Sequence, residues 1–521
     1  MKKHIKSRSV KYGSVSLILT ILALVAIIVF NVTLSLMATR YEWLYVSLSD
    51  NMTFSISDEC EEYLAKYVIP EVDEHNAALS AAGLEKEKLT ITFCDDESTI
   101  ASEDWKKYVY DSVHQIKELF PDYVEIEYLN IWENPSSARE MGITSTSDIV
   151  CSFGDRHETM NLTDFYIYDS SYSSTPVAYN GEKIIASCLM RVTQKDTPIC
   201  YFTANHGESF DGYEFMRTVV EAGYTIGFLD LFADEIPEDC SLLITFDPKQ
   251  DLIAADSISS VSEAEKLEAY MNAGGKYMVF LSADTFVSGS RANLEGFLED
   301  WGIKYSHETG SDGIEKCQLI KDSSNSLTVN GYTIISENAT NGLGESVMAG
   351  LPSNNVFGNS TRITFADDYV KSADGSYIFT SNGRTRVAGP LMVSHASAEA
   401  WAGGRAVARA ADEPFVLMAM STQECANGET ACLVASASVE FASDDHMKSA
   451  VIGNSRTITG IFKHFGRDNA PTDLVFSYFG STEIEILTTK TANTVTLLLA
   501  IVPTVLCAAA GVFVLIRRRY S

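Results

Sequence analysis

The protein has 521 residues, enough for two or three domains with buried cores. Its 70 Asp and Glu residues outnumber 39 Lys and Arg residues, so the formal net charge is −31. An acidic surface of this kind repels nucleic acid and favours cations or basic partners, although its simplest role is solubility. The ten cysteines show neither a C-x-x-C spacing nor the density of a disulfide scaffold. Composition therefore argues against a nucleic-acid-binding protein and against a small disulfide-stabilised domain.

Two uncharged apolar segments lie near the ends of the chain. No charged residue occurs between Lys11 and Arg40 or between Lys490 and Arg517, and each apolar core is long enough to cross a bilayer as a helix. Five cationic residues precede the first segment and three follow the second, so the positive-inside rule puts both ends in the cytoplasm. A cleaved signal peptide, the main alternative for the first segment, has a shorter apolar region of about 7–15 residues. The sequence predicts transmembrane helices over 12–39 and 491–516, cytoplasmic basic tails over 1–11 and 517–521, and an extracytoplasmic body between them.

The first part of this body, residues 40–195, alternates helices and strands. Ser57, followed by two acidic residues, predicts the N-cap of a helix that runs to Tyr67. The remaining elements follow from apolar periodicity: helices over 105–120 and 183–193 and strands over 89–94, 123–129, 148–153 and 165–168. This order predicts an α/β layer domain.

The second part, residues 196–490, has the clearest fold pattern. Residues 198–203 are a continuous apolar run, which is typical of a central parallel strand. Further elements alternate after it: helices over 211–222, 262–273 and 292–301 and strands over 225–231, 242–246 and 276–281. The alternation predicts an α/β fold with a doubly wound, Rossmann-like or flavodoxin-like sheet.

An irregular insertion is expected at about 306–414, because this stretch is rich in Ser, Asn, Gly and Thr. Short strands within it are expected at 332–335, 377–380 and 391–394. After it, apolar runs predict strands over 415–420 and 431–436 and a helix over about 448–465. Cys425 and Cys432 flank a polar turn and could form a hairpin disulfide, although free buried thiols are the expected state.

The short motif Asn205-His206-Gly207-Glu208 directly follows the apolar strand. Parallel α/β sheets place their sites at the carboxyl ends of strands, so these four residues are the candidate ligand-binding residues. His206 and Glu208 could also act as a base and its orienting partner, or as two metal ligands. No H-x-x-H motif supplies a third ligand nearby, and no G-x-S-x-G motif is present. We therefore predict no catalytic residue, no metal and no cofactor, and favour a structural or ligand-binding turn over catalysis.

Nucleotide-binding motifs are missing from the sequence. Gly274-Gly275-Lys276 lacks the preceding glycine of a P-loop, and no G-x-G-x-x-G follows a strand. If the protein takes part in ATP-driven work, the ATPase is another chain.

Several stretches carry, in chain order, motifs of one known family. They are Tyr45–Asp58, Phe202–Glu208, Ile236–Ile244, Tyr270–Phe280, Asn293–Ile303 and Leu433–Ala442, followed by the cationic Arg517–Arg519. The second is similar to a family strand that ends in T-G-H-G-E, and the fourth to a "yl..GGk" segment. Through these stretches the chain resembles the GldG family, the auxiliary subunits of gliding-motility-type ABC transport systems. It departs from the family at Asn205, where the family has Gly, and at Ala435–Ser438, where the family has a Gly-Asp-Ser segment.

The resemblance implies a transporter accessory subunit in the cell membrane rather than an enzyme. Its partners would be a separate ABC permease and a cytoplasmic ATPase, and its extracytoplasmic part would bind substrate or an envelope glycan or protein. Two alternatives remain open. One is a membrane-anchored envelope hydrolase that uses His206 and Glu208, and the other is a non-catalytic structural scaffold.

Overall fold

The computed structural model describes residues 56–168, 176–208, 212–255, 262–283, 291–309, 315–411, 413–449 and 451–479. Both predicted transmembrane helices, the two basic tails and most of the Tyr45–Asp58 stretch lie outside these ranges. Within them, no helix combines the length and the apolar character that crossing a bilayer requires. The described residues up to Tyr478 belong to one compact unit. The proposed boundary at residue 195 stays a prediction.

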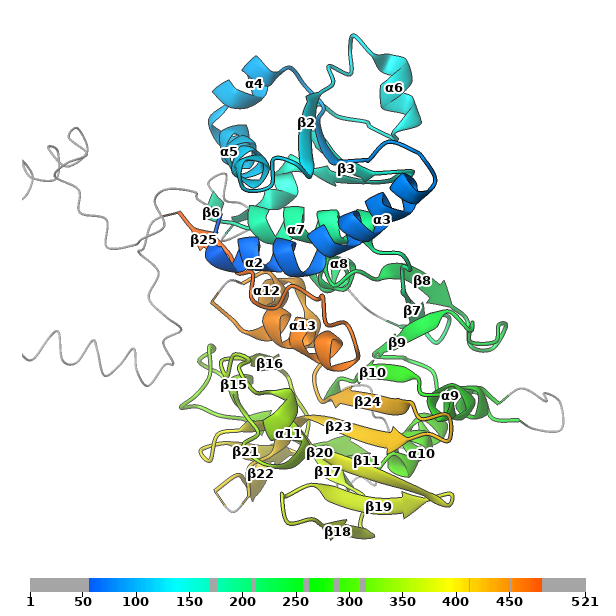
Figure 1. Ribbon diagram of the computed structural model, residues 1–521. Helices are drawn as coiled ribbons and strands as arrows, with labels where there is room; N and C mark the ends of the chain where they lie inside the picture. Colours follow the sequence, from blue (N-terminus) through cyan, green and yellow to red (C-terminus); the bar gives the residue numbers. More distant parts are fainter. Residues whose placement is uncertain are drawn as a thin grey trace, which may run out of the picture. The chain divides into compact units, whose positions relative to one another are not determined.

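A four-stranded sheet with the order β2-β1-β3-β4 forms the first layer (Figure 1). β1 (Leu89–Phe93) runs parallel to β2 (Val124–Tyr128), and helix α5 (Asp104–Leu119) provides the crossover between them. β3 (Asp148–Phe153) is antiparallel to β1 and pairs with β4 (Arg156–Asn161). The predictions of β1, β2, β3 and α5 are confirmed. β4 was missed because its six residues are polar or half-exposed and show no apolar alternation.

Helices cover this layer. α2 (Asp58–Tyr67) begins after Ser57, whose Oγ accepts a hydrogen bond from the Cys60 N–H at 3.2 Å, so the predicted N-cap is confirmed. α7 (Gly181–Thr193) is buried over most of its length and contacts α2, α5, β3 and β4. The smaller elements are α3 (Ile69–Ala81), α4 (Glu97–Ser102), α6 (Pro135–Glu140), β5 (Tyr166–Tyr168), β6 (Pro176–Tyr179) and β25 (Ser477–Tyr478).

The large sheet has a parallel half and an antiparallel half. Its main path is β16-β15-β20-β23-β24-β10-β9-β7-β8. The parallel strands are β7 (Ile199–Thr203), β8 (Thr225–Leu229), β9 (Cys240–Phe246), β10 (Lys276–Phe280) and β24 (Thr430–Ser436). The antiparallel strands are β15 (Thr333–Asn338), β16 (Val356–Gly358), β20 (Arg384–Ser394) and β23 (Val416–Glu424).

Helices pack on both faces of the parallel half. α8 (Tyr213–Glu221) and α13 (Asn454–His464) share one core with inward side chains such as Phe202 and Phe246. α9 (Glu263–Asn272) and α10 (Ala292–Asp300) share the opposite core with Leu243 and Tyr277. The prediction of a mixed α/β fold is confirmed, because helices pack against a buried core on each face of these parallel strands, although the edge strand β8 buries only Leu229.

In the stretch 306–414 the three short strands expected at 332–335, 377–380 and 391–394 are confirmed as parts of β15, β19 (Tyr377–Ser381) and β20, and further strands occur beside them. β20 is eleven residues long and lies between β15 and β23 in the large sheet. Its Gly389-Pro390 pair is typical of a turn, but the structure accommodates Pro390 at a shift of register against β23. Other strands here are β11 (Ile303–Tyr305), β12 (His307–Thr309), β13 (Glu315–Cys317), β14 (Leu319–Lys321), β17 (Ile363–Phe365), β18 (Tyr369–Lys371), β21 (Glu399–Ala402) and β22 (Arg405–Arg409), with helix α11 (Gly342–Val347).

Of two smaller expectations, the one for the last helix changed and the one of free buried thiols is confirmed. The helix predicted over about 448–465 is α13, which begins only after Gly453, and a separate short helix, α12 (Asp444–Met447), precedes the predicted range. Cys425 and Cys432 are buried free thiols rather than a hairpin disulfide. Cys432 lies opposite Thr422 in the β23–β24 ladder, so the two cysteines are not cross-strand partners.

Candidate functional site

The Asn205–Glu208 turn lies at the point where the chain changes direction across the parallel strands. From β7 the chain moves to β8 on one side and then returns to β9 on the other side of β7. Helices α8 and α9, which follow β7 and β9, pack on opposite faces. Crevices at such switch points, outside the carboxyl ends of the strands, are the usual binding sites of open α/β sheets. The predicted placement of the motif after a parallel strand is confirmed.

The backbone of the turn is fixed by two left-handed residues and by the next loop. Asn205 has φ of 74° and Gly207 has φ of 71°. The carbonyl oxygen of His206 accepts hydrogen bonds from the N–H groups of Lys249 and Gln250, each at 2.8 Å. A Cβ atom added to Gly207 would lie 3.2 Å from the Lys249 Cβ, so the glycine permits this close approach.

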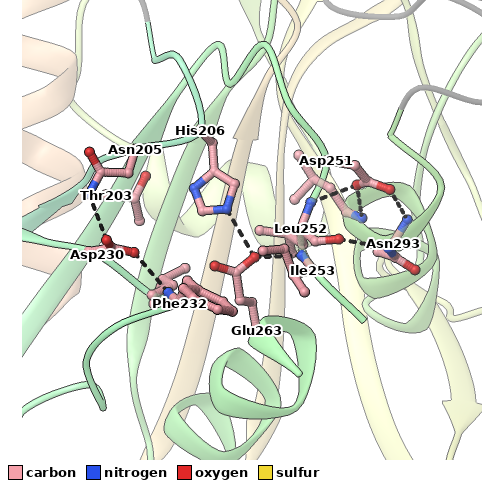
Figure 2. A network of polar contacts seen from close by, with 12 residues as sticks. Thr203, Asn205, His206, Asp230, Phe232, Asp251, Leu252, Ile253, Glu263 and Asn293 are labelled. Carbon is pink, nitrogen blue, oxygen red and sulfur yellow. Dashed lines mark hydrogen bonds and ion pairs between the residues drawn. The ribbon is translucent and has the colours of Figure 1, made fainter. Parts of the chain in front are cut away.

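The His206 side chain is buried, and it lies between the carboxylates of Glu208 and Glu263; Figure 2 shows the contact with Glu263. Its Nε2 lies 2.9 Å from Glu263 Oε2, and its Nδ1 lies 3.4 Å from Glu208 Oε1. The other Glu208 oxygen accepts a hydrogen bond from the His206 N–H at 2.7 Å. Contacts with Glu208 and Glu263 raise the pKa of His206 to about 10. His206 is therefore an imidazolium at neutral pH, and we call these three residues the His206 cluster.

Burial of Glu208 opposes its ionisation, but contacts with His206 and with backbone N–H groups hold its pKa below the usual range. The carboxylate is therefore charged at neutral pH. Three buried atoms of the cluster have no hydrogen-bond partner among the residues that the structure describes: His206 Nδ1, Glu208 Oε1 and Glu263 Oε1. The 3.4 Å contact between the first two is an ion pair without hydrogen-bond geometry. The cluster thus retains hydrogen-bonding capacity.

Sequence reasoning missed Glu263, the most deeply buried member of the cluster. Glu263 has no exposed surface, and its Oε2 also accepts a hydrogen bond from the Ile253 N–H at 2.5 Å. It is the first residue of α9, after the N-cap Ser262. Acidic residues are common in the first turn of helices because they interact favourably with the helix dipole. The position of Glu263 at the start of a helix already explains an acidic residue there, so nothing in the sequence pointed to its contact with His206.

Asn205 faces a different partner. Its Nδ2 donates a hydrogen bond to Asp230 Oδ2 at 2.6 Å, and Asp230 Oδ1 accepts one from the Phe232 N–H at 3.0 Å (Figure 2). The hydrogen bond from Asn205 helps to hold the pKa of Asp230 below its usual range. Of the four predicted residues, His206 and Glu208 come together, Asn205 joins the end of β8, and Gly207 shapes the turn. Two other histidines in the middle of the chain are not part of the cluster: His157 lies on β4, and His395 pairs with Glu337.

A cavity of about 470 Å³ opens beside the turn. Its apolar lining includes Phe202 and Phe246, whose rings are stacked with centroids 6.1 Å apart, and Phe228, which is 66% exposed. Its polar lining includes Asn205 and Glu208. A cavity of this size, apolar with a few convergent polar groups, has the usual character of a small-molecule site.

No three His, Cys, Asp or Glu side chains are arranged to hold a metal ion anywhere in the described ranges. The His206 cluster fits this finding, since its imidazole is already held as a cation between the carboxylates.

A second cavity, of about 370 Å³, lies between α7 and α8. Its surroundings include a second buried charged cluster. Lys183 Nζ lies 2.7 Å from Glu221 Oε2, while Arg217 lies 2.9 Å from Glu214 and 3.3 Å from Glu221. We call Lys183, Glu214, Arg217 and Glu221 the α7–α8 junction. Its two cations and two carboxylates balance.

Comparisons with known proteins complete the description of the site. No protein-family model matches the chain, and no characterised protein matches it in sequence. Among solved structures, the N-terminal domain of mmIFT52 is 15% identical, with a TM-score of 0.35 over 51% of this chain and 97% of that one. A ThuA-like protein from Bacteroides uniformis is 10% identical, with a TM-score of 0.27 over 54% of this chain and 97% of that one. PurLQS from Thermotoga maritima is 11% identical, with a TM-score of 0.26 over 52% of this chain and 99% of that one. At these values the likenesses carry no conclusion about family or activity.

Proposed function

We propose that the protein is a membrane-anchored, extracytoplasmic auxiliary subunit of an ABC-type transport system. It works with a separate permease and a separate ATPase, and its α/β body binds substrate or an envelope component. The proposal draws on the two apolar segments with outer cationic residues and on the ordered resemblance to the GldG family. The parallel strands and the change of direction at β7 support the finer expectation of a Rossmann-like or flavodoxin-like body.

The observation that carries the binding role is the cavity beside the Asn205–Glu208 turn. It lies at the switch point, it is lined mainly by apolar side chains, and Glu208 supplies a charged group with one unpartnered oxygen. This combination suits recognition of a small ligand. The chain carries no nucleotide-binding motif, so the proposal assigns ATP hydrolysis to a partner.

The hydrolase alternative has less support. A general base must be unprotonated near the working pH, whereas the pKa of His206 is raised to about 10 by its two carboxylate neighbours. The ring is also buried, so it has little contact with substrate. Ligand binding distinguishes the scaffold alternative from the proposed binding subunit. A small ligand would stabilise the binding subunit against unfolding but would not stabilise a scaffold.

Co-purification from native membranes tests the proposal. The full chain, tagged at one end and extracted in a mild detergent, is expected to bring down one permease and one ATPase in constant ratio. The Glu208→Gln variant should retain both partners, because the cavity is assigned to ligand and not to assembly. Recovery of the tagged chain without either partner contradicts the proposal.

A further inference from the structure

We infer that the cavity beside the Asn205–Glu208 turn takes a ligand with a cationic amine group attached to an apolar body. The inference deepens the proposed function by naming the ligand class of that site. It follows from three properties of the site: the chemistry of its polar lining, the charge of the His206 cluster and the aromatic character of its walls.

The polar lining favours a hydrogen-bond donor. Glu208 is the only ionisable residue among the described residues that line the cavity, and its Oε1 is without a hydrogen-bond partner. The Asn205 amide already directs its N–H toward Asp230, so that donor is engaged outside the cavity. A ligand carboxylate or phosphate would meet an acceptor of like charge, whereas an ammonium group would meet a complementary one.

The charge of the His206 cluster favours a cation. One imidazolium lies between two carboxylates, so the cluster has a net charge of −1. Lys249, whose backbone N–H binds the His206 carbonyl oxygen, already pairs through its side chain with Asp247. A buried carboxylate without a full counter-charge is costly. A bound ammonium group supplies the missing positive charge.

The walls favour an apolar body next to the amine. Phe202, Phe246 and Met216 provide a hydrophobic floor, and Phe228 exposes most of its ring at the end of the parallel half. Aromatic faces attract a cation within about 6 Å and bury an apolar group at the same time. A sugar would use the acceptors and could stack on an aromatic ring, but it would leave the excess negative charge uncompensated. The amine therefore explains more of the site than a glycan does.

Two probes of similar shape and opposite charge test the inference: 2-phenylethylamine and 3-phenylpropanoate. Each is titrated against the full chain in detergent, and the midpoint of thermal unfolding is recorded, because a ligand that binds only the folded state raises it. The amine is expected to raise the midpoint in a saturable way, while the acid leaves it unchanged. Glu208→Gln should weaken binding of the amine at least tenfold, and Phe228→Ala should do the same. Because Phe228 is 66% exposed, its replacement should leave the fold intact, so misfolding would not explain the weaker binding.

A matched control is Glu133→Gln, which removes an exposed carboxylate beside α6 and should leave the response to the amine intact. An equal response to both probes overturns the inference, and so does an undiminished response to the amine in both cavity variants. Stabilisation by maltose but not by the amine would replace it with a glycan site. If the amine fails while permease and ATPase still co-purify, the ligand class is wrong and the transport proposal stands.

Discussion

Two buried charged clusters in this protein differ in their balance. At the α7–α8 junction, Lys183 and Arg217 face the carboxylates of Glu214 and Glu221, and the charges cancel. In the His206 cluster, a single cation lies between the carboxylates of Glu208 and Glu263. The first joins two helices, whereas the second lies beside a cavity at the ends of parallel strands.

The comparison separates a structural role from a binding role. In the balanced cluster the two carboxylates already face two cations, so we expect its role to be to hold α7 against α8. An unbalanced cluster with unpartnered oxygens gains from a bound cation. Changes in the first should therefore alter stability alone, and changes in the second should alter stability, pH dependence and ligand binding.

The largest effect is expected at the α7–α8 junction. Lys183→Met leaves the buried Glu221 without its ammonium partner, which should lower the free energy of unfolding by about 3–5 kcal/mol. Denaturant titration of the full chain in detergent measures the loss. The matched control is Lys195→Met, which breaks an exposed pair with Glu74 and should cause no measurable change. Equal stability of the two variants would show that the junction is not structural.

The next effect is a pH dependence that arises from His206. Because its pKa is raised from 6.5 to about 10 on folding, its stabilising contribution is complete below pH 6.5 and is lost as the pH rises toward 10. Each pKa unit corresponds to about 1.4 kcal/mol. Because the site can relax, the free energy of unfolding should fall by less than the full shift implies, by roughly 3 kcal/mol over this pH range. Unfolding at a series of pH values should show this slope in the native protein and not in His206→Asn.

His464 is the control for that slope. Burial lowers the pKa of His464, so its contribution is present above pH 6.5 and is lost as the pH falls below that value. His464→Asn should therefore flatten only the acid side of the stability profile. A slope between pH 7 and 8 that is as steep in His206→Asn as in the native protein contradicts the assignment, because the cysteine thiols of the unfolded chain ionise only above this range.

A smaller effect is expected from the backbone of the turn. Gly207→Ala combines the left-handed φ of 71° with a Cβ contact of 3.2 Å, so a loss of about 2 kcal/mol is expected. Gly142 has φ of 68° but no atom within 4 Å of an added Cβ, so Gly142→Ala should lose only about 1 kcal/mol. The difference between the two variants in thermal unfolding isolates the contact with Lys249. A zero difference would mean that the turn and the next loop are not tightly packed.

The smallest effect is expected at the position where the chain departs from the GldG family. Asn205→Gly relieves a left-handed side chain but removes the hydrogen bond to Asp230, and these terms should cancel to within about 0.5 kcal/mol. Binding of the amine probe should also persist, because Asn205 directs its N–H group away from the cavity. Loss of binding in this variant would assign Asn205 to ligand recognition.

Much of the parallel half was predictable because each element carries its own local pattern. The apolar run before Asn205 predicted β7, and Gly274-Gly275 correctly predicted the end of α9. In the 306–414 stretch the short strands expected at 332–335, 377–380 and 391–394 were found, but the full extent of β20 was not predictable in the same way. β20 contains Gly389-Pro390 in its interior, and only its pairing with β15, β19 and β23 makes it a strand. Tertiary context decided this element over local propensity.

Two of the three residues of the His206 cluster could be predicted. His206 and Glu208 are two residues apart, so their side chains come into contact within a single turn of the chain. Glu263 is 57 residues from His206 in the sequence and reaches it only because β7 and β9 are neighbours in the sheet. No spacing rule links residues across such a crossover. The paired charges of Lys183 and Glu221 were missed for the same reason.

The most direct test of the account is the protonation state of His206 in the intact protein. The nine histidines can be labelled with ¹⁵N, and the His206 signals can be assigned by their loss in His206→Asn. If Glu208 and Glu263 hold His206 as an imidazolium, both of its ring nitrogens stay protonated from pH 5 to pH 8.5. Titration with a midpoint near 7 would contradict it, because His206 would then be available as a base and the turn would suit catalysis better than binding.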